Sequence, residues 1–313
     1  MKVAHGLFIV LLSAVVVGTF GCEGFTTSEP TQILLPGPPQ NLRATALDTS
    51  TIKFKWEVSE DVNVVKHYAY ILKDSKFRTI DSGTFDPNQT EYVKSDLKLG
   101  EVYTLTTYSV SDDTTGPKVK LGWSPAFVFK DIEGEPIRLT PERPGLMFYN
   151  ELLGTPAILD TNGKLNWDIV IDFTDDSTFK VFLRSPTTYP PYAKDSALRE
   201  QLRSASFAED VITGVASVDE IYSTKALNNP IFTGKAQELT KYSSNVGFIV
   251  KVVSKKGNQT VEHYAKILFK SANGSIVQGS GENRYVECEV SYQPVPGLPY
   301  AGTKKLNDPS PNP

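Results

Sequence analysis

The chain has 313 residues, a formal net charge of −4 and 40% hydrophobic residues. This length suits two domains, since a typical domain takes about 100–200 residues. The mildly acidic balance lacks the basic excess that general nucleic-acid binding requires, so we expect no nucleic-acid partner.

The N-terminus has the pattern of an export signal. Lys2 supplies a positive charge, and the apolar run over residues 6–20 is shorter than the roughly 20 residues that span a bilayer. We therefore predict a signal peptide over residues 1–21. Residues 17–22, VGTFGC, resemble the lipobox of bacterial lipoproteins. That resemblance implies that Cys22 is acylated, with chains such as palmitate, and becomes the mature N-terminus.

A lipid on Cys22 would make the membrane a partner of the mature chain, because acyl chains anchor a protein by burying methylene groups. We expect a tether over residues 22–36, where Gly, Thr, Ser and Pro are frequent. The expected location is the cell envelope, lipid-anchored in the outer membrane and facing the periplasm or the cell surface. The second cysteine, Cys288, falls on the apolar face of an alternating segment and is predicted to be a core residue.

Residues 37–130 alternate between apolar and polar side chains. Over residues 51–58, TIKFKWEV, apolar side chains occupy every even position, as in a half-buried strand. Residues 67–73 and 102–110 are also predicted strands, and turn-forming residues separate them. Several short strands at this spacing predict a β-sandwich.

These residues resemble the fibronectin type III domain. Residues 38–42, PPQNL, match its first strand, and Trp56 and Tyr68 match its buried aromatics. Residues 96–105, DLKLGEVYTL, match its tyrosine corner, where the Tyr103 hydroxyl bonds to upstream backbone. The resemblance implies an all-β fold that spaces and presents binding surfaces.

A proline-rich segment over residues 131–145 is predicted to link this domain to a second one over residues 146–293. The second domain is also expected to be mainly β, with little helix. We predict a hairpin from residues 169–173 and 178–183, late strands over residues 247–253, 264–270 and 285–292, and one helix over residues 195–207. Residues 294–313 are predicted to be a disordered proline-rich tail.

The second domain resembles the HmuY family of haem-capturing lipoproteins. The resemblance rests on Asn-Trp-Asp at residues 166–168, on the strand pair over 248–251 and 264–269, and on the aromatic segment 285–294. It implies a ligand-binding head. Residues 186–245, in the middle of the domain, do not match.

Haem bound through iron needs His, Met, Cys thiolate or Tyr as an axial ligand. The family takes two histidines from the middle of the domain, where this chain has no His, Met or Cys. The second domain contains one histidine, His263, and one methionine, Met147, and both lie near the matched ends. They are only weak candidates for metal ligands. We therefore expect no bis-histidine haem site, no metal site and no resident cofactor.

The middle segment is instead rich in tyrosine. Tyrosine offers a large contact area and a hydroxyl, so it is favoured in binding surfaces. The candidate ligand-binding residues are Tyr189, Tyr192, Tyr222 and Tyr242. Ordinary packing of loop aromatics is the structural alternative.

Catalytic patterns are weak. No Gly-x-Ser-x-Gly segment occurs, and the acidic residues Asp168, Asp172, Asp175 and Asp176 could supply a carboxylate pair only if the fold brought two of them together. We therefore predict no enzyme.

Two functions remain. In the first, a lipid-anchored protein captures a ligand through a HmuY-like head on a fibronectin type III stalk. In the second, both domains adhere to a protein or glycan and no small ligand is bound. A deep pocket in the second domain would favour the first function, and a flat aromatic surface would favour the second.

Overall fold

The computed structural model describes residues 35–298, except 113, 176–179, 223–230 and 257–258. The predicted signal peptide, Cys22 and nearly all of the predicted tether lie outside the described residues, as do residues 299–313 of the predicted tail. None of the described helices is long and apolar enough to cross a membrane.

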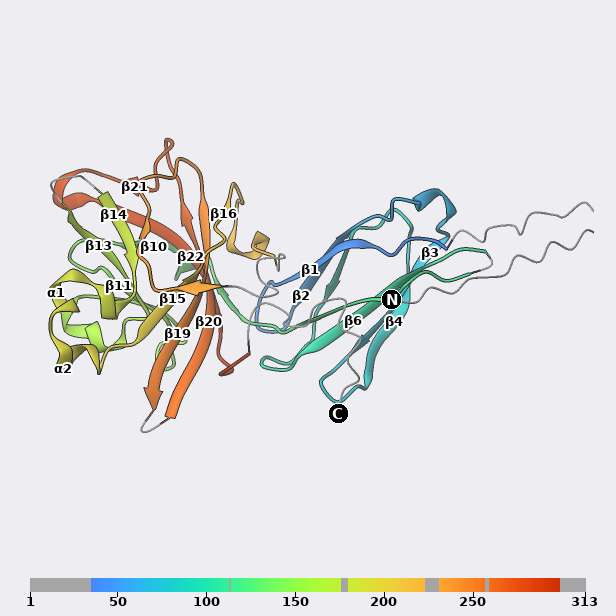
Figure 1. The fold of residues 1–313 in the computed structure, drawn as a ribbon, viewed down its shortest axis with the longest axis horizontal. Coiled ribbons are helices and arrows are strands. Elements are labelled where there is room, and N and C mark those ends of the chain that lie inside the picture. Colours follow the sequence, from blue (N-terminus) through green and yellow to red (C-terminus); the bar gives the residue numbers. More distant parts are fainter. Residues whose placement is uncertain (1–34, 113, 176–179, 223–230, 257–258, 299–313) are drawn as a thin grey trace, which may run out of the picture. The chain divides into compact units, whose positions relative to one another are not determined.

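The first domain is a sandwich of two antiparallel sheets (Figure 1). One sheet has the order β1-β2-β5 and the other has the order β4-β3-β6-β7. The strands are β1 (Gln40–Ala46), β2 (Ile52–Glu57), β3 (His67–Lys73), β4 (Thr79–Phe85), β5 (Glu91–Lys94), β6 (Tyr103–Val110) and β7 (Val119–Trp123), with a short 3-10 helix η1 (Val62–Val64).

Alternation of apolar side chains builds this sandwich. Ile52, Phe54 and Trp56 all point into its core and are at most 1% exposed. The Tyr103 hydroxyl accepts a hydrogen bond from the Lys98 N–H at 2.9 Å, which confirms the predicted tyrosine corner. The strand order and this corner confirm the all-β, fibronectin type III-like fold.

The second domain is a sandwich of a larger and a smaller sheet, and all pairings are antiparallel. The smaller sheet has the order β12-β11-β13-β14-β18. Its strands are β11 (Gly145–Asn150), β12 (Thr155–Leu159), β13 (Ile169–Asp175), β14 (Lys180–Arg184) and β18 (Gln237–Glu238).

The larger sheet has the order β17-β15-β19-β20-β22-β10-β9, and three short strands join it from the side. Its strands are β8 (Phe127–Phe129), β9 (Asp131–Ile132), β10 (Glu135–Leu139), β15 (Ser204–Ala208), β16 (Ile212–Thr213), β17 (Phe232–Thr233), β19 (Val246–Lys256), β20 (Gln259–Lys270), β21 (Val277–Gln278) and β22 (Tyr285–Gln293). The predicted strand pairs β13–β14 and β19–β20 and the closing strand β22 are confirmed.

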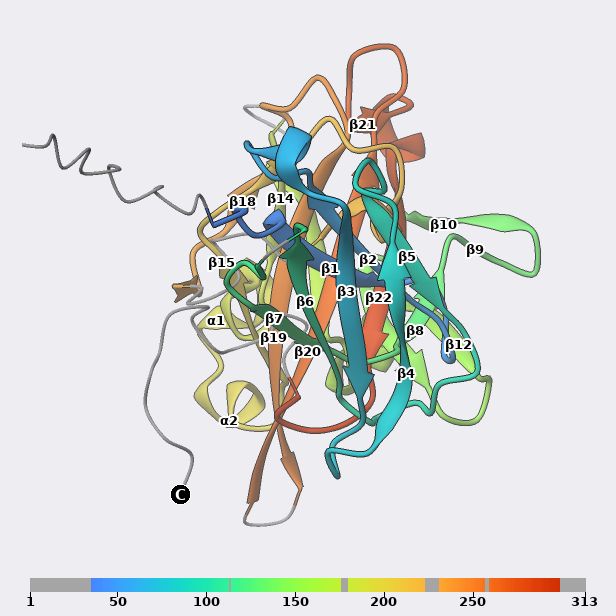
Figure 2. The same ribbon diagram turned by 90° about the vertical axis from the view of Figure 1, so that its right-hand side faces the viewer.

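The β19–β20 hairpin is longer than its neighbours. β22 pairs with β20 only from Tyr264 onward, and β15 pairs with β19 only as far as Val253. The far end of the hairpin therefore extends beyond the strands that flank it (Figure 2).

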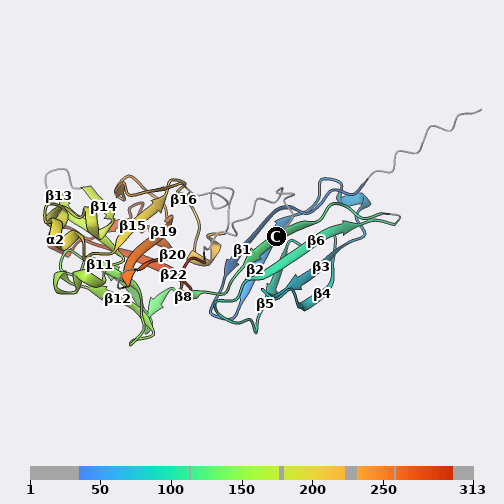
Figure 3. The ribbon, with the colours of Figure 1, turned by 60° about the horizontal axis from the view of Figure 1, so that its bottom comes forward.

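Helix is scarce, and the two α-helices lie together at one edge of the second sandwich (Figures 1 and 3). The α-helices are α1 (Pro190–Ala193) and α2 (Ser196–Arg199), and the 3-10 helices are η2 (Thr161–Asn166), η3 (Pro186–Thr188), η4 (Val218–Glu220) and η5 (Gly281–Asn283). The helix predicted over residues 195–207 is wrong beyond Arg199. Asp195 does cap α2, but Ser204–Ala208 alternates buried and less buried residues and pairs with β19 as a strand.

The linker predicted over residues 131–145 is also wrong for residues 131–139. These residues form β9 and β10, and β10 pairs with β22. Ile137 and Leu139 are fully buried in the core of the second domain. Even Phe127–Phe129, assigned to the first domain from sequence, pairs with β22. The change from one sheet system to the other therefore falls between Trp123 and Phe127.

Candidate ligand-binding site

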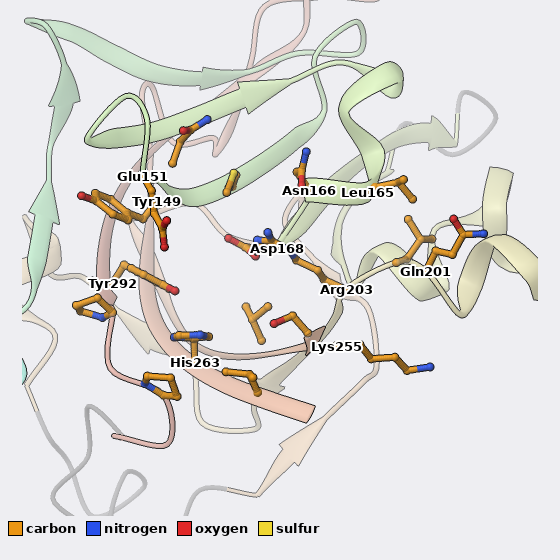
Figure 4. A pocket seen from close by; sticks show the side chains of 18 of the residues that line it. Tyr149, Glu151, Leu165, Asn166, Asp168, Gln201, Arg203, Lys255, His263 and Tyr292 are labelled. Atoms are coloured by element: carbon orange, nitrogen blue, oxygen red, sulfur yellow. Dashed lines mark hydrogen bonds and ion pairs between the residues drawn. The ribbon is translucent and has the colours of Figure 1, made fainter. Parts of the chain in front are cut away.

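A cavity of about 1000 Å³ opens in the second domain. It lies between β11 and the turn after it, the end of η2, the segment after α2, the β19–β20 hairpin and the end of β22 (Figure 4). Cavities of roughly 300–1,000 Å³ are typical of small-molecule sites. Its lining includes Met147, Tyr149, Asn150, Glu151, Leu152, Leu165, Asn166, Asp168, Glu200, Gln201, Leu202, Arg203, Val252, Ser254, Lys255, Val261, His263, Tyr292, Pro294 and Pro296.

Asp168 is the most buried charged group of the cavity, at 3% exposure. One carboxylate oxygen is 2.6 Å from Nη1 of Arg203, and the other accepts the Phe148 N–H at 2.7 Å. Burial raises the pKa of Asp168, and Arg203 and the Phe148 N–H oppose that rise. Both oxygens of the carboxylate are therefore engaged within the protein.

The residue before Asp168 explains why it is held so firmly. The Trp167 side chain is fully buried, and its indole N–H donates to the Asp160 carbonyl at 3.1 Å. A Cβ on Gly145 would lie 2.0 Å from Nε1 of Trp167, so only glycine lets β11 approach this ring. The Asp168 N–H then donates to the Leu146 carbonyl at 2.8 Å.

His263 approaches the cavity from β20 and is half-buried. Its Nδ1 is 3.4 Å from the Gln293 carbonyl oxygen. Because a carbonyl can only accept, Nδ1 carries the proton in this contact and Nε2 of the neutral ring is an acceptor. Burial lowers the pKa of His263, the Asp168 carboxylate opposes this, and Arg203 adds to the lowering.

Aromatic rings form a row beside these groups. The His263 ring lies 5.6 Å from Tyr292 at an interplanar angle of 29°, and Tyr292 lies 6.1 Å from Tyr149 at 17°. The row continues outside the cavity to Phe127, 4.2 Å from Tyr149. Burial raises the pKa of Tyr292, so its hydroxyl stays protonated and can donate. A flat aromatic wall therefore stands next to hydrogen-bond donors.

The rim of the cavity mixes charged and apolar groups. Glu151, Glu200 and Lys255 are exposed there. Leu152 is 95% exposed and Leu165 is 44% exposed, although leucines are usually buried. The lining is divided about equally between apolar and polar side chains, which suits an amphipathic molecule.

The two metal-ligating residues named from sequence, His263 and Met147, both line this cavity. The described residues contain no group of three or more His, Cys, Asp or Glu side chains that could hold a metal ion. A bis-histidine haem site does not fit, because His263 is the only histidine in the sequence after His67, which lies on β3 of the first domain.

None of the four candidate tyrosines lines the cavity, and of the four only Tyr189 and Tyr192 come together, with ring centroids 5.4 Å apart. Tyr189 and Tyr192 pack against Trp167 with ring centroids 5.9 Å from it. Tyr242 packs edge-on against Phe248. Tyr222 lies under cationic side chains, Arg43, Lys53 and Lys55. Their role in ligand binding stays a prediction, and Tyr189 in particular is only 6% exposed.

Sequence reasoning missed Arg203, Tyr149 and Tyr292 as site residues. Arg203 lies inside the segment predicted as helix, Tyr292 lies in the predicted closing strand, and Tyr149 lies in β11, for which the sequence predicts no element. Of the acidic residues considered for catalysis, Asp168 and Asp172 are held by different arginines, Arg203 and Arg184, each at 2.6 Å. Asp176 and the side chain of Asp175 lie outside the described part. Cys288 is 2% exposed in the core, as predicted, and burial raises the pKa of its thiol.

No family model matches the chain, and no curated protein matches it. Solved structures match it in part. The fibronectin type III domain of human collagen alpha-1(XX) chain is 15% identical, with 37% of this chain and 100% of that chain covered, at a TM-score of 0.27. The FN5 domain of Drosophila Lar is 17% identical, with 29% and 97% covered, at a TM-score of 0.24. A structure titled as a myokine is 20% identical, with 29% and 98% covered, at a TM-score of 0.25. These TM-scores are low, so the fold assignment rests on strand order.

Proposed function

We propose that the protein captures a small amphipathic ligand in the cavity of its second domain. The observation that carries this proposal is the cavity of about 1000 Å³, which combines an aromatic wall with inner hydrogen-bonding groups. Fibronectin type III-like domains commonly take part in adhesion or interaction, and the first domain would space and present the second. The second domain would then be a HmuY-like head.

The ligand would be held by aromatic and polar contacts and not by iron. Haemin tests this part of the proposal. We expect that any haemin spectrum is unchanged when His263 is replaced by leucine. A six-coordinate low-spin spectrum at micromolar affinity that disappears in His263→Leu would show that iron ligation drives capture.

A cavity-filling substitution tests capture itself. The described residues all fall in one compact unit that begins at Leu35, so a chain that begins at Glu23 keeps every element described. Pyrenebutanol, a fluorescent amphipathic alcohol, is the probe. We expect saturable binding that Ser254→Trp abolishes, because Ser254 lines the cavity. Thr260→Trp is the control, since Thr260 is exposed on the same hairpin outside the lining. Unchanged binding in Ser254→Trp would rule the cavity out.

We also propose that lipid on Cys22 anchors the chain to a membrane of the cell envelope, on the evidence of residues 17–22. Cys22→Ala removes the sulfur that would accept the lipid. The variant should accumulate as an unprocessed precursor that carries no labelled palmitate. Normal processing and membrane retention of the variant would contradict the anchor.

Adhesion to a protein or glycan is the second candidate. The observation in its favour is the turn between β11 and β12, where Leu152 and Leu153 are 95% and 64% exposed. Exposed neighbouring leucines favour a protein contact. If Leu152→Asp abolished binding to cells while Ser254→Trp had no effect on it, adhesion would replace capture as the better account.

A further inference from the structure

We propose that Arg203 receives an acidic group of the ligand, so that the cavity selects amphipathic carboxylates over their neutral analogues. This inference rests on the proposed function and adds the chemical class of the ligand.

The first support is the way Arg203 is held. Its Nη1 is fixed 2.6 Å from Asp168, and Asp168 is fixed in turn by the Phe148 N–H. The side chain of Arg203 keeps 25% exposure and lines the cavity. A guanidinium has five N–H donors in a planar fork, and the hydrogen bond to Asp168 uses one of them. An arginine whose position is set by a buried acid needs little reordering to take a carboxylate.

The second support is a matched pair elsewhere in the same domain. Asp172 and Arg184 are also 2.6 Å apart, with side-chain exposures of 2% and 22%, close to the 5% and 25% of Asp168 and Arg203. Arg184 packs over Phe182 at 4.8 Å and does not line the cavity. The two pairs therefore differ in what the arginine faces, which makes Arg184 a natural control.

The third support is the polarity of the inner wall. Asp168 has both oxygens engaged, whereas Arg203 and the Tyr292 hydroxyl can still donate (Figure 4). The other carboxylates of the lining, Glu151 and Glu200, are exposed at the rim. Hydrogen-bond donors on the inner wall, next to aromatic rings, suit a ligand that carries a carboxylate on an apolar body.

The test compares two probes that share one body, pyrenebutyrate and pyrenebutanol, by fluorescence titration of the chain that begins at Glu23. A charge-assisted hydrogen bond should favour the carboxylate by about tenfold or more. Equal affinities would overturn the inference and leave the proposed function standing. Binding of neither probe would overturn the proposed function.

Substitutions then locate the acidic group. Arg203→Lys keeps a positive charge opposite Asp168, so the fold should survive, but it removes the planar fork. We expect it to lose most of the preference for pyrenebutyrate, whereas Arg184→Lys should keep the full preference. If Lys255→Gln removed the preference and Arg203→Lys did not, the assignment to Arg203 would be wrong. The comparison of pyrenebutyrate with pyrenebutanol in the unsubstituted chain requires no variant. It therefore still tests the inference if Arg203→Lys fails to fold.

Discussion

The two sandwiches of this chain differ in where they bury charge. In the described part of the first domain, Asp74 is the only charged residue that is buried. In the second domain, four described charged residues are buried: Asp168, Asp172, Lys266 and Glu289. Burying charge costs free energy unless partners compensate, and each of these groups has such partners: Arg203 for Asp168, Arg184 for Asp172, Lys270 for Glu289, and the Thr45 hydroxyl and the Ile221 carbonyl for Lys266. Of the four, only Asp168 lines the cavity, and the ligand site that we propose is therefore in the second domain.

The largest expected effect concerns the boundary between the two domains. A fragment over residues 146–298 lacks β10 and with it Ile137 and Leu139, which are fully buried. Losing two such side chains should cost about 4–10 kcal/mol, at about 2–5 kcal/mol each. We therefore expect this fragment to be unfolded by circular dichroism. A fragment over residues 125–298 should fold, and equal stability of the two would show that β10 is not part of the second core.

Trp56→Ala tests whether the two cores are independent. Trp56 is 1% exposed and stacks on Phe85 at 5.0 Å, so its loss should cost about 3–5 kcal/mol. The first domain should unfold at lower denaturant concentration, while the second domain still binds pyrenebutanol. Trp167→Ala is the matched change in the second domain and should abolish binding. Loss of binding in Trp56→Ala would mean that the site depends on the first domain.

The ionisation of His263 gives a smaller effect. Its pKa lies below the ordinary value, so the ring is neutral at about pH 8 and gains a proton as the pH falls. Asp168 favours that proton, Arg203 opposes it, and Tyr292 stays neutral. An added positive charge should tighten binding of pyrenebutyrate by up to about tenfold, the effect of about 1.4 kcal/mol. Pyrenebutanol should show no such change between about pH 8 and about pH 5.5. Because the pKa of His263 is lowered, the protonation of its ring is followed by NMR over the same range. A flat profile for pyrenebutyrate while the ring gains its proton would place His263 away from the bound carboxylate.

In the first domain the sequence predicts β1, β2, β3 and β6, because alternating side chains mark β2, β3 and β6, the resemblance marks β1, and Tyr103 marks the corner. It does not predict β4, β5 or β7, and β4 is mostly exposed and lacks a clear alternation. The second domain was harder. Its long strands β19, β20 and β22 are apolar enough to be read directly, but β10 is short and begins beside Pro136, which favoured a linker. Ser204–Ala208 was read as helix because Leu198, Leu202 and Ala205 fall at helical spacing, although pairing with β19 decides its state.

The sequence predicts only some of the residues that line the cavity. His263, Met147 and Asp168 were each singled out, but for unrelated reasons. They line one cavity because β20, β11 and the segment after η2 meet through pairings between residues far apart in the chain. No local sequence pattern predicts which distant strands come together to line a cavity. Of the tyrosines that do line it, Tyr292 is in the predicted closing strand and has no local mark of a site, and Tyr149 is in β11, for which the sequence predicts no strand.

Photo-crosslinking tests the central claim, that the second domain holds the ligand, most directly. Benzoylbenzoic acid is an aromatic carboxylate that couples to nearby C–H bonds under light. Irradiation of the chain followed by peptide mapping should label residues 147–152, 252–263 and 292–296, and excess pyrenebutyrate should suppress the labelling. Labelling confined to residues 40–123, or labelling of the second domain that pyrenebutyrate does not suppress, would contradict the account.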